Sequence, residues 1–248
     1  MRHGLPALAG LVFALACSGA PEATPDAGAI PRVFVLTALE AQMGVLPRSE
    51  TALRARYALE DGSPVAGVEV RFAIFGDPRG STLSRDRATT DDEGVASVTL
   101  SAGAGDGEYE FRVRASVDTA AADFFVAVSA TGFADATVRM AYAGDQEGAI
   151  VGLIVRLYAA TGCAELDPRA PPEGARSQVV TGLSDSVRFT NLLVQQRYAA
   201  LCSGAGEAGS PVVGCATIAP GQLRTGLASE IVVTLDDLAA TPARDFTV

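Results

Sequence analysis

The sequence has almost no histidine and no lysine or tryptophan, and these gaps narrow the chemistry that it can perform. Its only histidine is His3, and all nineteen basic residues are arginine. Histidine is the usual general base near neutral pH and the commonest metal ligand. Beyond residue 3 the chain can therefore build no Ser-His-Asp or Cys-His triad and no His-ligated zinc site. A Ser-Lys dyad is excluded as well, and we expect a protein that is not an enzyme.

The chain is acidic, with 19 basic residues against 29 acidic ones and a formal net charge of −10. Surfaces that bind nucleic acid are basic, and anionic lipid repels an acidic protein. We therefore expect no nucleic-acid partner and no electrostatic adsorption to a membrane. No motif points to a cofactor. With 248 residues, 48% of them hydrophobic, the chain can form one or two domains with sizeable cores.

The first seventeen residues have the order of a secretory signal: an early arginine, an apolar run, and small residues directly before Cys17. The apolar run is shorter than the roughly 20 residues of a membrane-spanning helix. Residues 11–17, LVFALAC, resemble the lipobox of bacterial lipoproteins. The resemblance implies that Cys17 is lipidated and becomes the mature N-terminus, anchoring the protein to a membrane. The alternative is a plain secretion signal in which the cysteine is incidental.

The composition changes twice after the signal. Residues 18–31 are mostly small, are interrupted by proline and show no periodicity, which is typical of a flexible tether. From residue 32 onwards, short apolar runs alternate with clusters of Gly, Pro, Asp and Ser. We therefore predict an all-β protein with two Ig-like β-sandwich domains in tandem after a signal peptide and tether. The expected boundaries are 1–16 for the signal, 17–31 for the tether, and 32–130 and 131–248 for the two domains.

The first predicted domain shows period-two alternation of apolar and polar residues, as expected for half-buried strands. In the run at 108–115, for example, Tyr109, Phe111 and Val113 share one face. Residues 60–64 and 88–94 contain turn residues and separate the neighbouring runs. About seven strands are expected, over residues 33–36, 51–59, 65–74, 81–84, 95–100, 108–115 and 122–128.

Two segments of this domain carry a family resemblance. Residues 62–72, GSPVAGVEVRF, and residues 88–100, ATTDDEGVASVTL, resemble the bacterial Ig-like domain group 1, the Big-1 modules of invasin-type and intimin-type surface proteins. The resemblance covers about residues 33–130. It implies an Ig-like sandwich that serves as a spacer or adhesive module, and it implies no catalytic residues.

The second predicted domain has seven further strand candidates. Residues 187–193 and 197–201 resemble the hairpin of transthyretin-like and carboxypeptidase-regulatory-like sandwich modules, in which an Asn-Leu turn joins two strands. We expect these two segments to form a hairpin. The strand candidates are 136–143, 150–159, 177–180, 186–193, 197–203, 211–218 and 229–235.

Three cysteines remain in an oxidising compartment once Cys17 carries lipid, so one intrachain disulfide is possible and one cysteine is left over. We favour Cys163–Cys215, which would attach the long loop at 163–176 to the sheet. The alternative is Cys202–Cys215, which closes a smaller loop and constrains the unfolded chain less. The three thiols lack the C-x₂-C spacing of a structural zinc site, and no metal is expected there.

Several acidic clusters could suggest calcium. Asp91, Asp92 and Glu93 are contiguous, whereas calcium loops place their oxygen ligands at alternating positions. Asp145 and Glu147 alternate, but two carboxylates fall short of a calcium shell. We interpret both clusters as turns.

Two functions are consistent with these observations. The first is a non-catalytic, lipid-anchored cell-envelope or surface protein that acts as an Ig-like binding or spacer module of the adhesin type. Its partners would be the membrane, through the lipid, and an envelope protein, surface protein or polysaccharide. The alternative is an accessory subunit of an envelope secretion or surface-assembly complex, which would recognise partners by strand addition. Both place the protein outside the cytosol, in the cell envelope, the outer membrane or at the cell surface.

Overall fold

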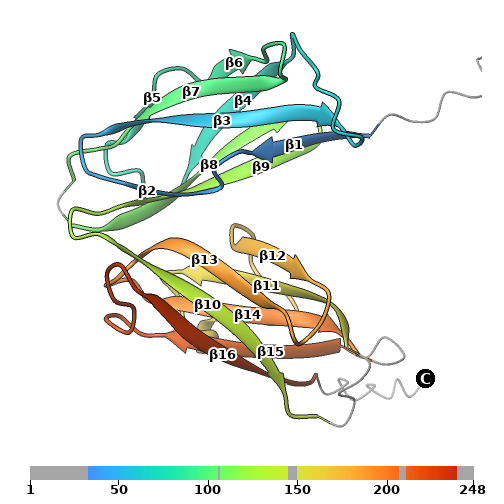
Figure 1. The fold of residues 1–248 in the computed structure, drawn as a ribbon. Helices are drawn as coiled ribbons and strands as arrows, with labels where there is room; N and C mark the ends of the chain where they lie inside the picture. The colour runs from blue at the N-terminus through green and yellow to red at the C-terminus, as the bar shows by residue number, and fades with distance from the viewer. Residues whose placement is uncertain (1–32, 106, 145–149, 207–210, 239–248) are drawn as a thin grey trace, which may run out of the picture. The chain divides into compact units, whose positions relative to one another are not determined.

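The predicted all-β sandwich fold is confirmed by a computed structural model, which describes residues 33–105, 107–144, 150–206 and 211–238 (Figure 1). Strands form three sheets in the described residues, and the one helical element is a short 3₁₀ turn, η1 (Cys163–Glu165). No helix in these ranges is long and apolar enough to cross a membrane. The described residues belong to one compact unit.

Residues 34–128 form two facing sheets, which we call the first sandwich. The four-stranded sheet has the order β1-β3-β7-β5, and the five-stranded sheet has the order β2-β9-β8-β4-β6. The first sheet contains β1 (Phe34–Ala38), β3 (Glu50–Leu59), β7 (Val95–Ser101) and β5 (Thr82–Leu83). The second contains β2 (Gln42–Val45), β9 (Ala120–Val128), β8 (Tyr109–Val117), β4 (Glu69–Phe75) and β6 (Arg87–Thr89).

Strict alternation builds the core of the first sandwich. Along β8 every odd-numbered residue is buried and every even-numbered residue is half-buried. The inner face carries Tyr109, Phe111 and Val113, which pack in one core with Leu53 and Phe124. The outer face of the same strand carries Glu110, Arg112 and Arg114. Polar side chains on that face are therefore free to contact the rest of the chain.

Residues 133–237 form a seven-stranded sheet, which we call the second sandwich, with the order β12-β11-β14-β15-β16-β10-β13. The β10–β16 pair is parallel, and β15 joins β16 over two residue pairs only. Side chains from both ends of the sheet meet in one core, which includes Phe189, Tyr198 and Val233. The strands are β12 (Arg176–Val180), β11 (Val151–Ala159), β14 (Tyr198–Ala205), β15 (Pro211–Ile218), β16 (Ala228–Asp237), β10 (Phe133–Tyr142) and β13 (Ser186–Leu193).

A second, smaller apolar cluster lies outside this core. Tyr158 and Leu201 are buried there against residues of the segment between β11 and β12, including Leu166 and Ala175. The 163–175 loop thus packs in part against the outer surface of the sheet.

Each strand expected from the sequence overlaps an observed strand, but two observed strands were missed. β2 follows β1 closely and pairs in parallel with β9. β6 overlaps the start of the segment 88–94, which the sequence assigned to a turn, and it pairs with β4. Both are short, and β2 contains Gly44, so neither shows a readable alternation.

The predicted hairpin at 187–201 is wrong. β13 and β14 follow one another in sequence, but β13 pairs with β10, whereas β14 pairs with β11 and β15. The turn between them crosses from one part of the sheet to another. Because both strands bury apolar residues at the same period, their sequence does not reveal which neighbour each one pairs with.

The predicted boundary at 130/131 falls between β9 and β10. Its two flanking regions have separate sheets and separate cores. The contacts of the chain nevertheless group Val33–Val248 together. The division into two domains therefore stays a prediction, and so do the signal peptide and the tether, because residues 1–32 lie outside the described part of the chain.

Candidate functional site: a buried polar junction

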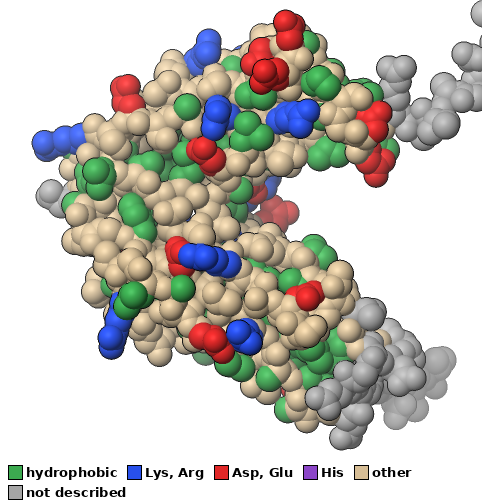
Figure 2. All heavy atoms as spheres, viewed as in Figure 1, with side chains coloured by type: hydrophobic (Ala, Val, Ile, Leu, Met, Phe, Trp, Pro, Cys, Tyr) green, Lys and Arg blue, Asp and Glu red, His purple; other side chains and the backbone are tan. Residues whose placement is uncertain are grey.

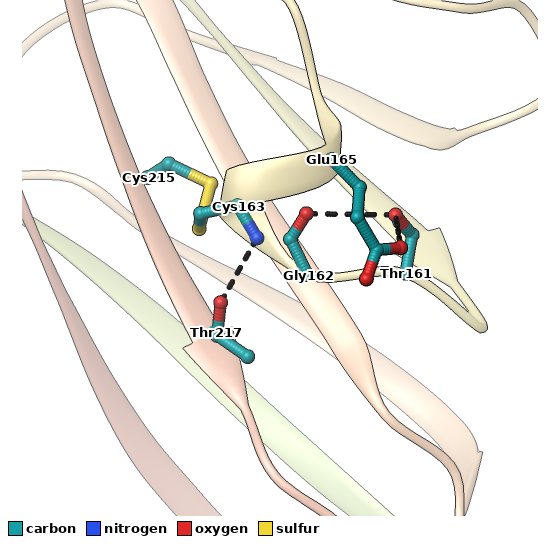
Figure 3. Close-up of a disulfide and its surroundings, with 6 residues drawn as sticks. All are labelled: Thr161, Gly162, Cys163, Glu165, Cys215 and Thr217. Atoms are coloured by element: carbon teal, nitrogen blue, oxygen red, sulfur yellow. Dashed lines mark hydrogen bonds between the residues drawn. A yellow bond between two sulfur atoms is a disulfide. The ribbon is translucent and has the colours of Figure 1, made fainter.

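The favoured disulfide is present. Cys163 and Cys215 are bonded, with their Cα atoms 5.8 Å apart (Figure 3). Cys163 lies at the start of η1, and its backbone N–H donates to Thr217 Oγ1 at 3.0 Å. Thr161 Oγ1 donates to Glu165 Oε2 at 2.9 Å, and this hydrogen bond holds the pKa of the Glu165 carboxyl below its usual value. The start of the loop is thereby fixed to β15.

The alternative pairing, Cys202–Cys215, is wrong. Cys202 is a free, fully buried thiol on β14. In the β14–β15 ladder it lies opposite Gly214, and Leu201 lies opposite Cys215. Successive side chains on a strand point to opposite faces, so Cys202 faces the core while Cys215 faces the outer cluster. Burial raises the pKa of the Cys202 thiol to about 12.

The most unusual group in the described residues is the buried guanidinium of Arg176, whose residue is only 2% exposed. Arg176 opens β12 in the second sandwich, and its partner is Glu110 on β8 of the first. Arg176 Nη2 lies 2.9 Å from Glu110 Oε1, and Nε donates to the same oxygen at 3.2 Å. Buried charges of this kind persist only when they are paired and hydrogen-bonded.

Gln42 and Phe125 complete the surroundings of Arg176. Arg176 Nη1 donates to Gln42 Oε1 at 3.1 Å and to the carbonyl of Thr190 at 2.7 Å. Gln42 Oε1 also accepts the backbone N–H of Thr190 at 3.0 Å. The guanidinium carbon lies 5.6 Å from the centre of the Phe125 ring, within cation–π range. One arginine therefore contacts four strands of the two sandwiches, β2, β8, β9 and β13.

Tyr198 binds the second oxygen of Glu110. Its hydroxyl donates to Glu110 Oε2 at 3.2 Å and accepts the backbone N–H of Leu193 at 2.9 Å. Burial raises the pKa of the Tyr198 phenol well above its usual value, and the neighbouring Glu110 charge adds to this shift. The hydroxyl therefore stays protonated and keeps donating at any physiological pH.

Beside this network, the backbone of β2 lies close to Asn191 and Phe133 of the second sandwich. Asn191, at a positive φ of 56°, donates from Nδ2 to the carbonyl of Gln42 at 3.0 Å. A Cβ at Gly44 would lie 2.7 Å from both Asn191 Oδ1 and the Phe133 ring. A side chain at this position would force Asn191 or Phe133 to move. We call the set Gln42, Glu110, Arg176, Asn191 and Tyr198 the junction.

Open hollows flank the junction on two sides. One, of about 470 Å³, is lined by Glu108, Thr131 and Gln195. There the Glu108 carboxylate accepts hydrogen bonds from Ser129 Oγ and from the Gln195 backbone N–H. The other, of about 280 Å³, is lined in part by Arg112 and Glu173. Because the Glu108 carboxylate already accepts hydrogen bonds from both sandwiches, it helps to connect them and is not a free group for binding a ligand.

The surface carries both charge signs in mixture. Figure 2 shows acidic and basic side chains interspersed on the face drawn. Many are paired, such as Arg54 with Glu40 at 2.9 Å and Arg188 with Asp135 at 2.6 Å. The face drawn in Figure 2 therefore shows no large area of a single sign.

The acidic cluster at 91–93 forms the turn that the sequence predicts. Asp91 Oδ1 accepts the backbone N–H groups of Glu93 and Val95, both at 2.9 Å. No group of three potential metal ligands occurs among the described residues. Asp145, Glu147 and the lipidation candidate Cys17 lie outside the described residues.

Sequence reasoning missed the junction entirely. Arg176 follows a proline-rich loop and resembles any solvated charge, and Glu110 is one of several charged residues on an alternating strand. A weak signal exists at Gln42, which is polar in a segment otherwise suited to a strand. What brings these residues together is long-range packing between positions more than 60 apart in sequence.

Comparisons with known proteins give structural likenesses only. No family model and no curated protein matches the chain. The Yersinia pseudotuberculosis adhesin InvE has 14% identity and a TM-score of 0.28, over 75% of this chain and 58% of that one. Trypsin-activated alpha-2-macroglobulin from Escherichia coli has 13% identity and a TM-score of 0.31, over 76% of this chain and 16% of that one. The S-layer protein rSbsC has 12% identity and a TM-score of 0.32, over 75% and 25%. Likenesses this weak carry no argument about function.

Proposed function

We propose that the protein is an exported, lipid-anchored cell-envelope or surface protein that acts as a non-catalytic binding or spacer module. Two observations support the proposal. The N-terminal segment ends in Cys17 within a lipobox-like sequence, followed by a tether. Beyond the tether, the junction connects two sandwiches through a buried ion pair, and this connection is the observation that carries the proposal.

A spacer or a presenting module must keep its shape under load. Interfaces between domains of one chain are usually polar and mobile. The Arg176–Glu110 pair differs, because breaking it would leave a nearly inaccessible guanidinium without its counter-charge. The hydrogen bonds of Gln42 and Asn191 add fixed geometry on either side. The junction thus favours a single orientation of the two sandwiches.

The alternative is an accessory subunit of a secretion or surface-assembly complex that binds partners by strand addition. The observation that favours it is the edge strand β12, where Val179 is 74% exposed. Against it, Gln178 Nε2 of the same strand already donates to the carbonyl of Arg188 on the opposite edge strand, at 2.9 Å. A spacer would be isolated alone, and a subunit in a stoichiometric complex.

The experiment is metabolic labelling with a palmitate analogue, comparing the wild type with Cys17→Ala. Membrane fractionation and protease treatment of intact cells then locate the protein. We expect label in the wild type only, with the protein in the membrane fraction and accessible to protease. Unlabelled wild type recovered as soluble protein would overturn the lipid anchor and leave a freely secreted binding protein.

A further inference from the structure

We infer that the Cys163–Cys215 disulfide sets the stiffness of the junction by holding the loop that ends in Arg176. The inference rests on the proposed role of the junction as a stiffening connection. The bridge lies at one end of the 163–175 segment, and the buried arginine follows directly after the other end. Three sets of contacts lead from one end to the other.

The first contacts hold the beginning of the loop. Cys163 is covalently attached to β15, and its N–H is bonded to Thr217 Oγ1. Leu166 then packs against the outer cluster that contains Tyr158 and Leu201. This cluster is small and lies over the outside of the sheet. It therefore has less apolar burial than the main core to hold the loop in place.

The second contacts hold the last residues of the loop before Arg176. The Tyr158 hydroxyl donates to the carbonyl of Pro172 at 3.0 Å. Two residues further on, a Cβ at Gly174 would lie 3.6 Å from Arg112 Nη1 of the first sandwich. Ala175 packs on the same outer cluster as the two bridged cysteines. The loop thus contacts the outer cluster near both of its ends, and its last residues approach Arg112 of β8.

The third contacts are those of Arg176 itself. Arg176 is the first residue of β12, where it pairs with Leu157 of β11, and the loop joins the strand at this residue. From this place its guanidinium reaches Glu110, Gln42 and the Thr190 carbonyl. An interaction that needs such fixed geometry is sensitive to small displacements of the segment that carries it. Freeing the start of the loop therefore loosens its end.

Reduction is the means by which the bridge can be opened. A dithiol such as dithiothreitol attacks one sulfur of the bridge and forms a mixed disulfide, which its second thiol resolves. Two electrons and two protons pass to Cys163 and Cys215, and the reagent becomes a cyclic disulfide. Both cysteines are half-buried, so the reagent has access. Cys202 faces the core and cannot replace either partner.

The test is amide hydrogen exchange on the full chain, with and without dithiothreitol, in the wild type and in the double variant Cys163→Ser/Cys215→Ser. We expect reduction of the wild type to speed exchange in residues 42–45 and 108–112 by at least about fivefold, because these segments lose their partner in local opening. The double variant should exchange at the fast rate from the start and show no response to dithiothreitol. Strands β3 and β7, remote from the junction, should be unaffected and serve as the internal control.

A second variant distinguishes a failure of this inference about the disulfide from a failure of the proposed stiffening role of the junction. Arg176→Met keeps the bridge but removes the guanidinium, so it should speed exchange in the same two segments regardless of reduction. If Arg176→Met loosens them and reduction loosens only the 160–175 region, the disulfide merely fastens its loop and the inference is wrong. If neither change affects residues 42–45 and 108–112, the junction itself is not a stiffening connection. Reduction of the folded wild type keeps the test valid even where the double variant fails to fold.

Discussion

The two sandwiches reach the same class of fold by different means. The first has two separate sheets around one alternating core, and none of the four cysteines lies in it. The second wraps one sheet around its core, adds an outer cluster beneath a disulfide-bonded loop, and holds most of the large fully buried side chains. The loop of the second sandwich ends in Arg176, and the outer face of β8 in the first sandwich supplies its partner Glu110. Asn191 of β13 and Tyr198 of β14 add further contacts to the first sandwich.

The largest expected effect comes from removing the counter-charge at the junction. Glu110→Ala leaves Arg176 buried and unpaired, and we expect a loss of about 3–5 kcal/mol in the free energy of unfolding. Urea unfolding measures the loss. Glu40→Ala is the matched control, because its ion pair with Arg54 is half-exposed and should change stability by less than about 1 kcal/mol. Equal effects of the two variants would contradict the difference between junction and surface.

The next effect, loss of the disulfide, is expected in the second sandwich and not in the first. The bridge spans 52 positions, for which loop-closure entropy corresponds to about 4 kcal/mol. In Cys163→Ser/Cys215→Ser we expect this loss in the second sandwich, measured by urea unfolding at equilibrium. Peptide mapping of the non-reduced wild type should recover the two cysteines in one linked peptide. A linked peptide containing Cys202 instead would disprove the connectivity.

A smaller effect tests the close approach of Gly44 to Asn191 and Phe133. A methyl group at residue 44 would overlap Asn191 and Phe133, so Gly44→Ala should cost about 1–3 kcal/mol through forced displacement. Gly182→Ala is the control, because nothing lies within 4 Å of a Cβ there. The shift of the urea-unfolding midpoint of each variant from that of the wild type measures the loss of stability. An unchanged midpoint in Gly44→Ala would mean that the two sandwiches do not approach at this point.

The last effect is absent at neutral pH and develops only at alkaline pH, in the second sandwich alone. Burial raises the pKa of Cys202 to about 12, against about 8.5 for a free thiol. A raised pKa contributes stability below pH 8.5 that is lost as the pH rises towards 12. We therefore expect stability to fall over this range in the wild type and much less in Cys202→Ala. In the native protein at pH 8, iodoacetamide should not label Cys202, and rapid labelling would show that the thiol is not buried.

Much of the fold could be predicted from the sequence, because alternation along single strands is a local property. β8 shows its inner face directly in Tyr109, Phe111 and Val113. The favoured disulfide could also be predicted, since Cys163 precedes a long loop that needs an attachment. Strand partners could not, as the wrong hairpin at β13 and β14 shows, because pairing depends on the whole sheet. The junction was invisible for the same reason: Arg176 and Glu110 look like ordinary surface charges until packing buries them.

The central claim is that the junction makes residues 33–238 behave as one body, and differential scanning calorimetry of the full chain tests it most directly. The account predicts a single transition whose van't Hoff enthalpy equals its calorimetric enthalpy, as for one cooperative unit. In Glu110→Ala the same scan should separate into two transitions, one for each sandwich. Two transitions already present in the wild type would contradict the claim.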